Sequence, residues 1–165
     1  SIFKNKFLFN FALGKENKTE KIYIDNANNG NASLMKSMMN TSKYNSYKTE
    51  EITIKSVGDF FADIRSKILN QKLIIKIDTQ MYDELIFSLL PKEIIKNTHM
   101  ICFEFTHLNG IRGPKFSMEK FSQNLNYFNI IWSDNCSQIS KNKLIEMCSR
   151  NKNINHSETD IYLMK

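Results

Sequence analysis

The amino-acid sequence predicts an α/β protein with a mostly parallel, doubly wound sheet and helices on both of its faces. Apolar runs typical of strands alternate with segments of helical spacing between residues 72 and 165, in the order strand, helix, strand, helix, strand, helix, strand. This order is typical of parallel strands that are connected through helices. The run Leu73–Ile77 is apolar almost throughout, as expected of a strand buried in such a sheet. The last strand is short and terminal, so an antiparallel direction stays open for it.

Length and composition are those of a single globular domain. The chain has 165 residues, of which 41% are hydrophobic and 12% aromatic, and this length corresponds to one domain or part of one. No apolar run approaches the length of a membrane span, and no secretory signal is visible. A cytoplasmic protein without a membrane span is therefore the default expectation.

The chain is basic, with a net charge of +6. Binding to nucleic acid would explain this charge, and so would a general enrichment in lysine and asparagine. Only three of the 23 basic residues are arginines, and the lysines are scattered among acids, whereas proteins that read phosphates and bases favour clustered arginines. We therefore expect no nucleic-acid partner, and a basic nucleic-acid binder is the weaker alternative.

The cysteines and histidines predict neither a metal site nor a disulfide framework. The three cysteines are widely spaced without a C-x-x-C pair, and the three histidines lack metal-ligand spacing. Cys102 lies within an apolar strand pattern, and we expect it to be a small core residue.

The N-terminal half predicts strands at residues 7–13, 21–24 and 51–55. The first run is apolar, whereas the third alternates between polar and apolar residues. Between them, residues 25–33 predict an irregular loop and residues 34–39 a short helical turn. Ser56 is placed to cap a helix whose apolar residues follow at helical spacing, namely Val57, Phe60, Phe61 and Ile64.

The C-terminal half predicts four strands and three helices in alternation. The strands are expected at residues 72–78, 99–106, 129–132 and 161–164. The helices are expected at residues 81–90, 118–127 and 141–150, with a further helical turn at 91–96 that begins with Pro91 and a cap at Ser117.

Asp78 is the strongest candidate for a functional residue. It ends the apolar run of residues 72–78 and so delivers a carboxylate to the carboxyl end of a strand, where open α/β sheets bind their ligands. A carboxylate there can accept a proton, hold a metal ion or orient a hydroxyl or ammonium group. The alternative is that Asp78 caps the helix that follows, because aspartate is a good N-cap.

Other polar residues have both functional and structural explanations. Asp83 and Glu84 lie in the first turn of a predicted helix, where the helix dipole favours acids. Glu104 interrupts an apolar strand and needs a partner if it is buried, for which Lys76 is one candidate. The polar cluster at residues 28–33 is either a surface loop or part of a substrate site. The chain has five glycines, and their spacing matches no glycine-rich nucleotide-binding loop.

Residues 76–80 together with 82–84, Lys-Ile-Asp-Thr-Gln and Tyr-Asp-Glu, resemble the signature Lys-Ile-Asp-x-x-Gly-x-Glu of the FkbM-type methyltransferases. These are class I enzymes that use S-adenosylmethionine. The resemblance continues in the same order along nearly the whole chain, at residues 10–14, 30–34, 52–61, 103–105 and 159–163. It implies a Rossmann-like methyltransferase fold and methyl transfer to a hydroxyl of a sugar or other small metabolite, with a small-molecule or glycan acceptor as partner.

The resemblance also implies roles for particular residues. Asp78 is expected nearest to the methyl acceptor, as a base or as a residue that orients the acceptor, with support from Gln80 and Asp83. Asp78 is also expected near the cofactor, whose adenine side Ala12 and Leu13 are expected to line. The residues expected to face the acceptor are Asn31, Ser33 and Glu104.

Two departures from the family pattern affect these expectations. Met81 stands where the family has a glycine, which would allow a close backbone approach or a positive φ. The segment that carries the family's first two strands and its cofactor loop is not found in the sequence, so we expect an N-terminally truncated catalytic domain with sheet edges that lack partners. A degenerate, non-catalytic binding or scaffold domain is the alternative function.

Overall fold

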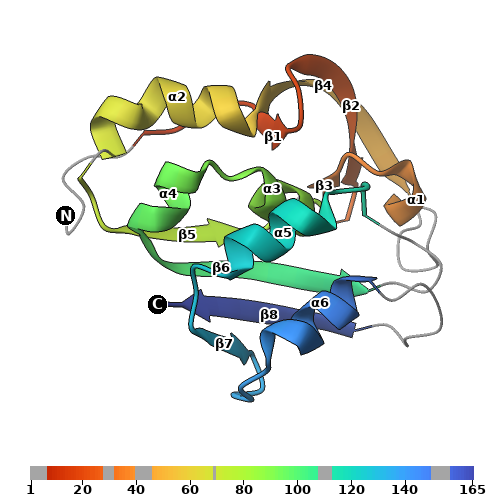
Figure 1. The fold of residues 1–165 in the computed structure, drawn as a ribbon. Coiled ribbons are helices and arrows are strands. Elements are labelled where there is room, and N and C mark those ends of the chain that lie inside the picture. The colour runs from red at the N-terminus through yellow and green to blue at the C-terminus, as the bar shows by residue number, and fades with distance from the viewer. Residues whose placement is uncertain (1–6, 28–31, 40–45, 69, 108–112, 150–156) are drawn as a thin grey trace, which may run out of the picture.

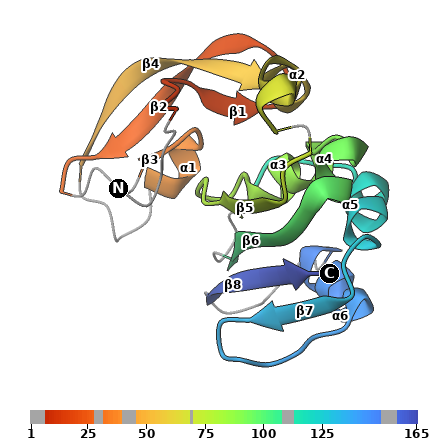
Figure 2. The same ribbon diagram turned by 90° about the vertical axis from the view of Figure 1, so that its left-hand side faces the viewer.

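The computed structural model describes residues 7–27, 32–39, 46–68, 70–107, 113–149 and 157–165 (Figure 1). Within these residues the strands form two separate four-stranded sheets, which we call sheet A and sheet B. Sheet A comes from the N-terminal third of the chain and sheet B from the remainder. Figure 2 shows sheet A above sheet B, with the helices that follow β5 beside sheet B.

Sheet A is built around an antiparallel pair of long strands. Its strand order is β1 (Ala12–Gly14), β4 (Tyr47–Ser56), β2 (Lys18–Asp25) and β3 (Ala32–Ser33). β2 and β4 are antiparallel over eight paired positions, and β1 is parallel to β4. Most side chains of β2 and β4 are exposed or half-buried. Sheet A is therefore a thin layer with little core of its own.

Sheet B has the strand order β5 (Leu73–Ile77), β6 (Thr98–His107), β8 (Ser157–Met164) and β7 (Ile130–Ser133). β8 is antiparallel to both of its neighbours, whereas β5 is parallel to β6. β5, β6 and β7 therefore share one direction, and their carboxyl ends lie at the same edge of the sheet. The expectation that the last strand could be antiparallel is confirmed, and this strand lies inside the sheet.

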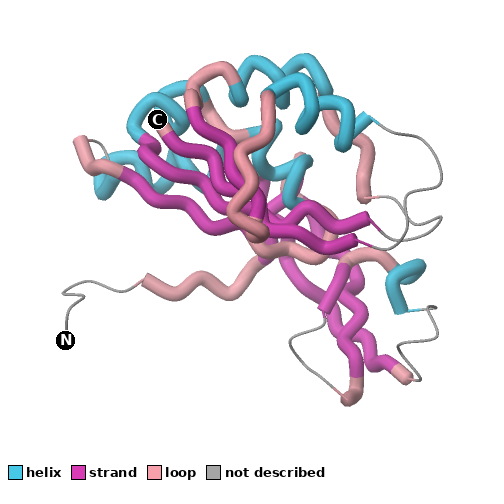
Figure 3. The backbone as a smooth tube through the Cα atoms, turned by 90° about the horizontal axis from the view of Figure 1, so that it is seen from below, coloured by secondary structure: helices cyan, strands magenta, loops and turns pink. Residues whose placement is uncertain are grey.

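The prediction of a mostly parallel, doubly wound sheet with helices on both faces is wrong. The described strands form two mixed sheets in which two strand pairs are parallel and four are antiparallel. The N-terminal strands pair with one another instead of joining sheet B, because β2 and β4 offer a long antiparallel register. Most helices lie on one side of the strands of sheet B (Figure 3).

The helices that follow β5 form one layer against sheet B (Figure 2). α3 (Asp83–Leu89) contacts β5 and β6 and also α5 (Met118–Leu125), which in turn contacts α6 (Lys141–Ser149). α4 (Lys92–Asn97) follows α3, and α2 (Val57–Ile68) connects the two sheets. α1 (Lys36–Met39) is a single turn beside sheet A.

The main core lies between this helical layer and sheet B. Its largest fully buried side chains include Phe87 of α3, Phe103 of β6 and Phe121 of α5. The Phe87 ring lies 5.6 Å from that of Phe103 and 4.9 Å from that of Phe121, distances at which aromatic pairs attract. Cys102 is buried on the other face of β6, as predicted.

Local sequence signals predicted the helix starts well. Ser56 accepts a hydrogen bond from the backbone N–H of Asp59 at 3.0 Å, and Ser117 accepts one from Lys120 at 3.2 Å. Both residues therefore cap their helices as expected. The predicted strand 7–13 is wrong for most of its length, because β1 begins only at Ala12 and the side chains of Phe7, Leu8 and Phe9 are exposed.

Candidate functional site

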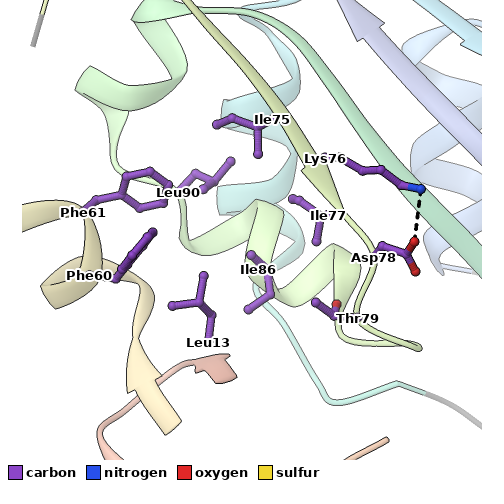
Figure 4. Close-up of a pocket in the computed structure, with 10 residues that line it drawn as sticks. All are labelled: Leu13, Phe60, Phe61, Ile75, Lys76, Ile77, Asp78, Thr79, Ile86 and Leu90. Atoms are coloured by element: carbon purple, nitrogen blue, oxygen red, sulfur yellow. Dashed lines mark ion pairs between the residues drawn. The ribbon is translucent and has the colours of Figure 1, made fainter. Parts of the chain in front are cut away.

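A pocket of about 450 Å³ lies between β1 and α2 on one side and β5 and α3 on the other (Figure 4). We call it the β1–β5 pocket. Seven of its side chains are apolar, and we call them the apolar wall: Leu13, Phe60, Phe61, Ile75, Ile77, Ile86 and Leu90. Its polar lining comes from three residues at the carboxyl end of β5 and just beyond it, namely Lys76, Asp78 and Thr79. Pockets of this size are typical of small-molecule sites.

Asp78 lies at the carboxyl end of β5, as the sequence predicted. Its carboxylate forms an ion pair with the Lys76 ammonium group at 3.1 Å, and both side chains are more than half exposed. Strand residues two apart point to the same face, so Lys76 and Asp78 share the face of β5 opposite to Ile75 and Ile77 (Figure 4). Asp78 does not cap α3, because that helix begins at Asp83 after Tyr82.

The turn that follows Asp78 contains two residues with positive φ, Gln80 at 47° and Met81 at 76°. Both values lie in the left-handed region, which residues other than glycine adopt at a cost of about 1 kcal/mol or more. Met81 is also 96% buried, with 4% exposure. A Cβ atom on Gly113 would lie 2.3 Å from the Met81 carbonyl oxygen, so this turn needs a glycine at Gly113.

Asp83 is completely buried at the start of α3. Its Oδ2 accepts a hydrogen bond from the Thr79 hydroxyl at 3.1 Å, whereas its Oδ1 has no hydrogen-bond partner of good geometry among the described residues. Burial raises the pKa of this carboxyl group, and the Thr79 hydroxyl and nearby backbone amides, including that of Glu104, act in the opposite direction. Asp83 thus connects the end of β5 with β6 and is shielded from any ligand in the β1–β5 pocket.

Glu84, next to Asp83, is the more strongly perturbed acid. Desolvation raises its pKa from 4.5 to about 8, with a smaller contribution from the charge of Asp83. Its charge also acts on Cys148 of α6, whose thiol pKa burial raises. Glu84 is half-buried and lies outside the lining of the β1–β5 pocket.

Ser33, one of the two loop residues expected to face the acceptor, contacts the turn that follows Asp78. Ser33 is buried, accepts a hydrogen bond from the Met35 N–H at 3.1 Å and donates one to the Gln80 carbonyl at 3.5 Å. β3 therefore lies against the turn that follows Asp78. Asn31, the other loop residue, lies outside the described residues.

Glu104 lies in β6, half-buried and directly opposite Asp160 of β8. Ile77 pairs with Phe103, so the next residues along the two strands, Asp78 and Glu104, are neighbours at the carboxyl edge of sheet B. The expected site residues Asp78, Gln80, Asp83, Ser33 and Glu104 thus gather around one turn.

Leu13 lines the β1–β5 pocket, whereas Ala12 is half-buried in β1 and is not part of the lining. The sequence did not indicate that Phe60, Phe61, Ile75, Ile86 and Leu90 would line this pocket. The adjacent pair Phe60–Phe61 carried one available signal, because consecutive helix residues lie about 100° apart and two aromatic side chains then cover a wide apolar surface of α2.

Comparison with protein-family models, with curated proteins and with solved structures found no match to this chain. Among the described residues, no cluster of three or more acids, cysteines or histidines is arranged to hold a metal ion. No described helix is long and apolar enough to cross a membrane.

Proposed function

We propose that this chain is a methyltransferase domain of the FkbM type, which transfers a methyl group from S-adenosylmethionine to a hydroxyl group of a sugar or other small metabolite. One observation carries the proposal. Three segments that resemble the family, far apart in the sequence, supply lining of the β1–β5 pocket: Leu13 from residues 10–14, Phe60 and Phe61 from residues 52–61, and Asp78 from residues 76–84.

The backbone at Met81 is a second, independent support. The family has a glycine at this position, and the φ of Met81 is 76°, in the region that favours glycine. The backbone at Met81 therefore has a conformation that suits a glycine, although a methionine occupies the position.

The residues present fit the cofactor in two respects. Leu13 offers apolar contact suited to the flat adenine ring, and the Asp78 carboxylate offers a negative charge suited to the sulfonium cation. When bound, S-adenosylmethionine supplies an activated methyl group. In this proposal the Asp78 carboxylate accepts the proton of the acceptor hydroxyl or orients that hydroxyl, and Lys76 holds the carboxylate in place. Asp83 acts indirectly, because through Thr79 it fixes the turn after Asp78.

The test is methyl transfer by the full-length protein and by Asp78→Ala, with S-adenosylmethionine and a panel of hydroxy compounds. Loss of a general base typically costs about 100-fold or more in rate. Asp63→Ala is the matched control, because Asp63 is another exposed aspartate that pairs with a lysine, Lys55, on the surface. Unchanged methylation by Asp78→Ala would remove Asp78 from the mechanism.

A non-catalytic binding or scaffold domain is the second candidate, and the strained, buried Met81 favours it. This candidate predicts that isothermal titration of the full-length protein with S-adenosylmethionine gives no heat of binding. A clear binding isotherm would exclude it in its simplest form.

A further inference from the structure

Charged residues are segregated between the two ends of the strands of sheet B. At the carboxyl end, Asp78, Glu104 and Asp160 lie on neighbouring strands. Figure 1 shows the amino ends of β5 and β6 at the opposite end, together with α4, the last turn of α2 and the C-terminus. Six exposed basic residues gather there, and we call this surface the basic end: Arg65, Lys67, Lys72, Lys92, Lys96 and Lys165.

Contacts between distant segments hold the basic end together. Lys72 directly precedes β5, and Lys96 lies in the last turn of α4, which continues into β6. The first residues of β5 and β6 are paired. The Lys165 ammonium group donates a hydrogen bond to the Lys96 carbonyl, and its backbone N–H donates one to the His99 carbonyl at 3.2 Å. The basic end is therefore one surface, built from segments far apart in the sequence.

The basic end accounts for nearly all of the net charge of the protein. Glu93 is the one acid within its segments, residues 65–72, 92–99 and 164–165, so these segments carry +5 of the net charge of +6. Among the described residues, no ion pair involves any of the six basic residues. Lysines elsewhere are paired with acids, as Lys18, Lys48 and Lys76 show.

The stability of the helices does not explain this arrangement. A cation near the C-terminal end of a helix is favourable, which accounts for Lys67 and Lys96. Lys92, by contrast, lies in the first turn of α4, where the helix dipole disfavours a cation. It also precedes Lys96 by four positions, a spacing at which like charges repel each other. The basic end thus carries positive charge that neither its helices nor ion pairs use.

The residue types favour an anionic membrane surface over nucleic acid as the partner. Five of the six basic residues are lysines, which act as point charges. Nucleic acids are read by arginine forks and by stacked aromatic side chains. A bilayer with anionic headgroups attracts lysines through its surface potential and requires no particular geometry of them. Charges spread over the ends of several elements suit such a broad surface.

We propose that the basic end docks this protein onto anionic lipid bilayers. The acids at the carboxyl end of sheet B are repelled by the same surface, so the strands point their amino ends towards the lipid. β6 has ten residues at about 3.3 Å each, which places the turn after Asp78 about 30 Å from the bilayer. The inference does not depend on methyl transfer.

Co-sedimentation of the full-length protein with lipid vesicles tests the proposal. Vesicles of phosphatidylcholine with phosphatidylserine should bind the protein at low salt, and vesicles of phosphatidylcholine alone should not. Binding should be lost towards about 0.5 M NaCl, because salt screens exposed charges. Equal binding to both kinds of vesicle, or binding to neither, overturns the proposal.

Matched variants locate the binding surface. Lys72→Gln combined with Lys92→Gln should weaken binding about 25-fold, because each lysine near an anionic surface contributes about a factor of five. Lys18→Gln combined with Lys48→Gln removes the same charge from exposed lysines of sheet A and should change binding less than about twofold. Thermal unfolding checks that both variants are folded. An equal loss of binding in both variants overturns the role of the basic end.

An RNA hairpin and a DNA duplex test the rival partner. The unmodified protein should bind both more weakly than it binds phosphatidylserine vesicles at the same salt concentration. Tighter binding to either nucleic acid, weakened by Lys72→Gln with Lys92→Gln, would assign the basic end to nucleic acid and overturn the membrane as its partner.

Discussion

Sheet A and sheet B each contain one strand of ten residues and one of eight, but they differ in how their strands are buried. Every buried residue of the main described core comes from α2, from sheet B or from the segments that follow β5, and none comes from β1 to β4. β6 alone contributes Ile101, Phe103 and Phe105. The side chains of β2 and β4 are almost all exposed or half-buried, and Ile54 is the buried apolar residue that they supply.

The difference shows what makes a sheet stable in this molecule. Backbone pairing is extensive in both sheets, but net stabilisation by a hydrogen bond exchanged with water is small. Apolar burial supplies most of the driving force, and only sheet B has a helical layer to bury its strands. Sheet A is therefore held by its hydrogen bonds and by its junction with α2, next to the β1–β5 pocket.

The largest expected effect is in the core of sheet B. Phe87→Ala should destabilise the protein by about 3–5 kcal/mol, because Phe87 is fully buried among aromatic rings and the cavity left behind cannot close completely. Tyr23→Ala in sheet A should cost about 1 kcal/mol or less, since Tyr23 is half-buried and its described ring contact is the cross-strand pair with Tyr47 at 5.6 Å. Equilibrium unfolding in urea measures the loss of stability in both variants. Equal losses would contradict the conclusion that sheet B carries the core and sheet A does not.

The next effect is a pH dependence that belongs to the helical layer of sheet B. The pKa of Glu84 is about 8 in the folded protein, compared with an ordinary value of 4.5, which we take for the unfolded chain. Between pH 4.5 and about pH 8 the folded protein therefore retains a proton that the unfolded chain has lost. The free energy of unfolding should therefore fall as pH rises from 4.5 to about 8, by at most about 1.4 kcal/mol per pH unit. Asp83 contributes in the same direction.

Glu84→Gln should remove most of this pH dependence of the free energy of unfolding. The variant should therefore become more stable relative to the unmodified protein as the pH rises towards 8. Glu50→Gln, an exposed glutamate of sheet A paired with Lys48, is the control and should leave the slope unchanged. Thermal unfolding at several pH values measures both variants. A slope that survives in Glu84→Gln would show that another group is responsible.

The smallest expected effect concerns the turn after Asp78. Gln80→Gly should stabilise the protein by up to about 1 kcal/mol, because glycine adopts the φ of 47° without strain and this gain is partly offset by the flexibility of glycine in the unfolded chain. Asn70→Gly, at a φ of 70°, should change stability less, since asparagine tolerates this region. Destabilisation by Gln80→Gly would mean that the Gln80 side chain makes a contact that outweighs the strain.

Local structure was largely predictable, and the pairing of the strands was not. The helix starting after Ser56 and the strand ending before Asp78 depend on neighbouring residues, which the sequence displays directly. The eight-position register of β2 with β4, and the place of β8 between β6 and β7, depend on contacts between distant segments. Alternation of polar and apolar residues indicates which face of a strand is buried, but not which strand lies beside it.

The candidate site likewise combines features that the sequence predicts with features that depend on the tertiary structure. The position of Asp78 at a strand end and the shared face of Lys76 and Asp78 follow from the period of a strand. The complete burial of Asp83 and the convergence of Phe60, Phe61 and Leu13 on β5 do not, because they depend on how α2 and β1 lie against sheet B.

By itself the sequence determined most of the strands, the helices that Ser56 and Ser117 cap, and the delivery of a carboxylate to the end of β5, because each of these depends on residues a few positions apart. Tertiary structure alone decided that the strands form two mixed sheets, that one of them carries the core, and that an apolar pocket lies where they meet. The physical reason is that strand pairing and burial are properties of segments brought together from a distance. Backbone groups of every strand can pair with many partners, and only the burial of particular side chains selects among them.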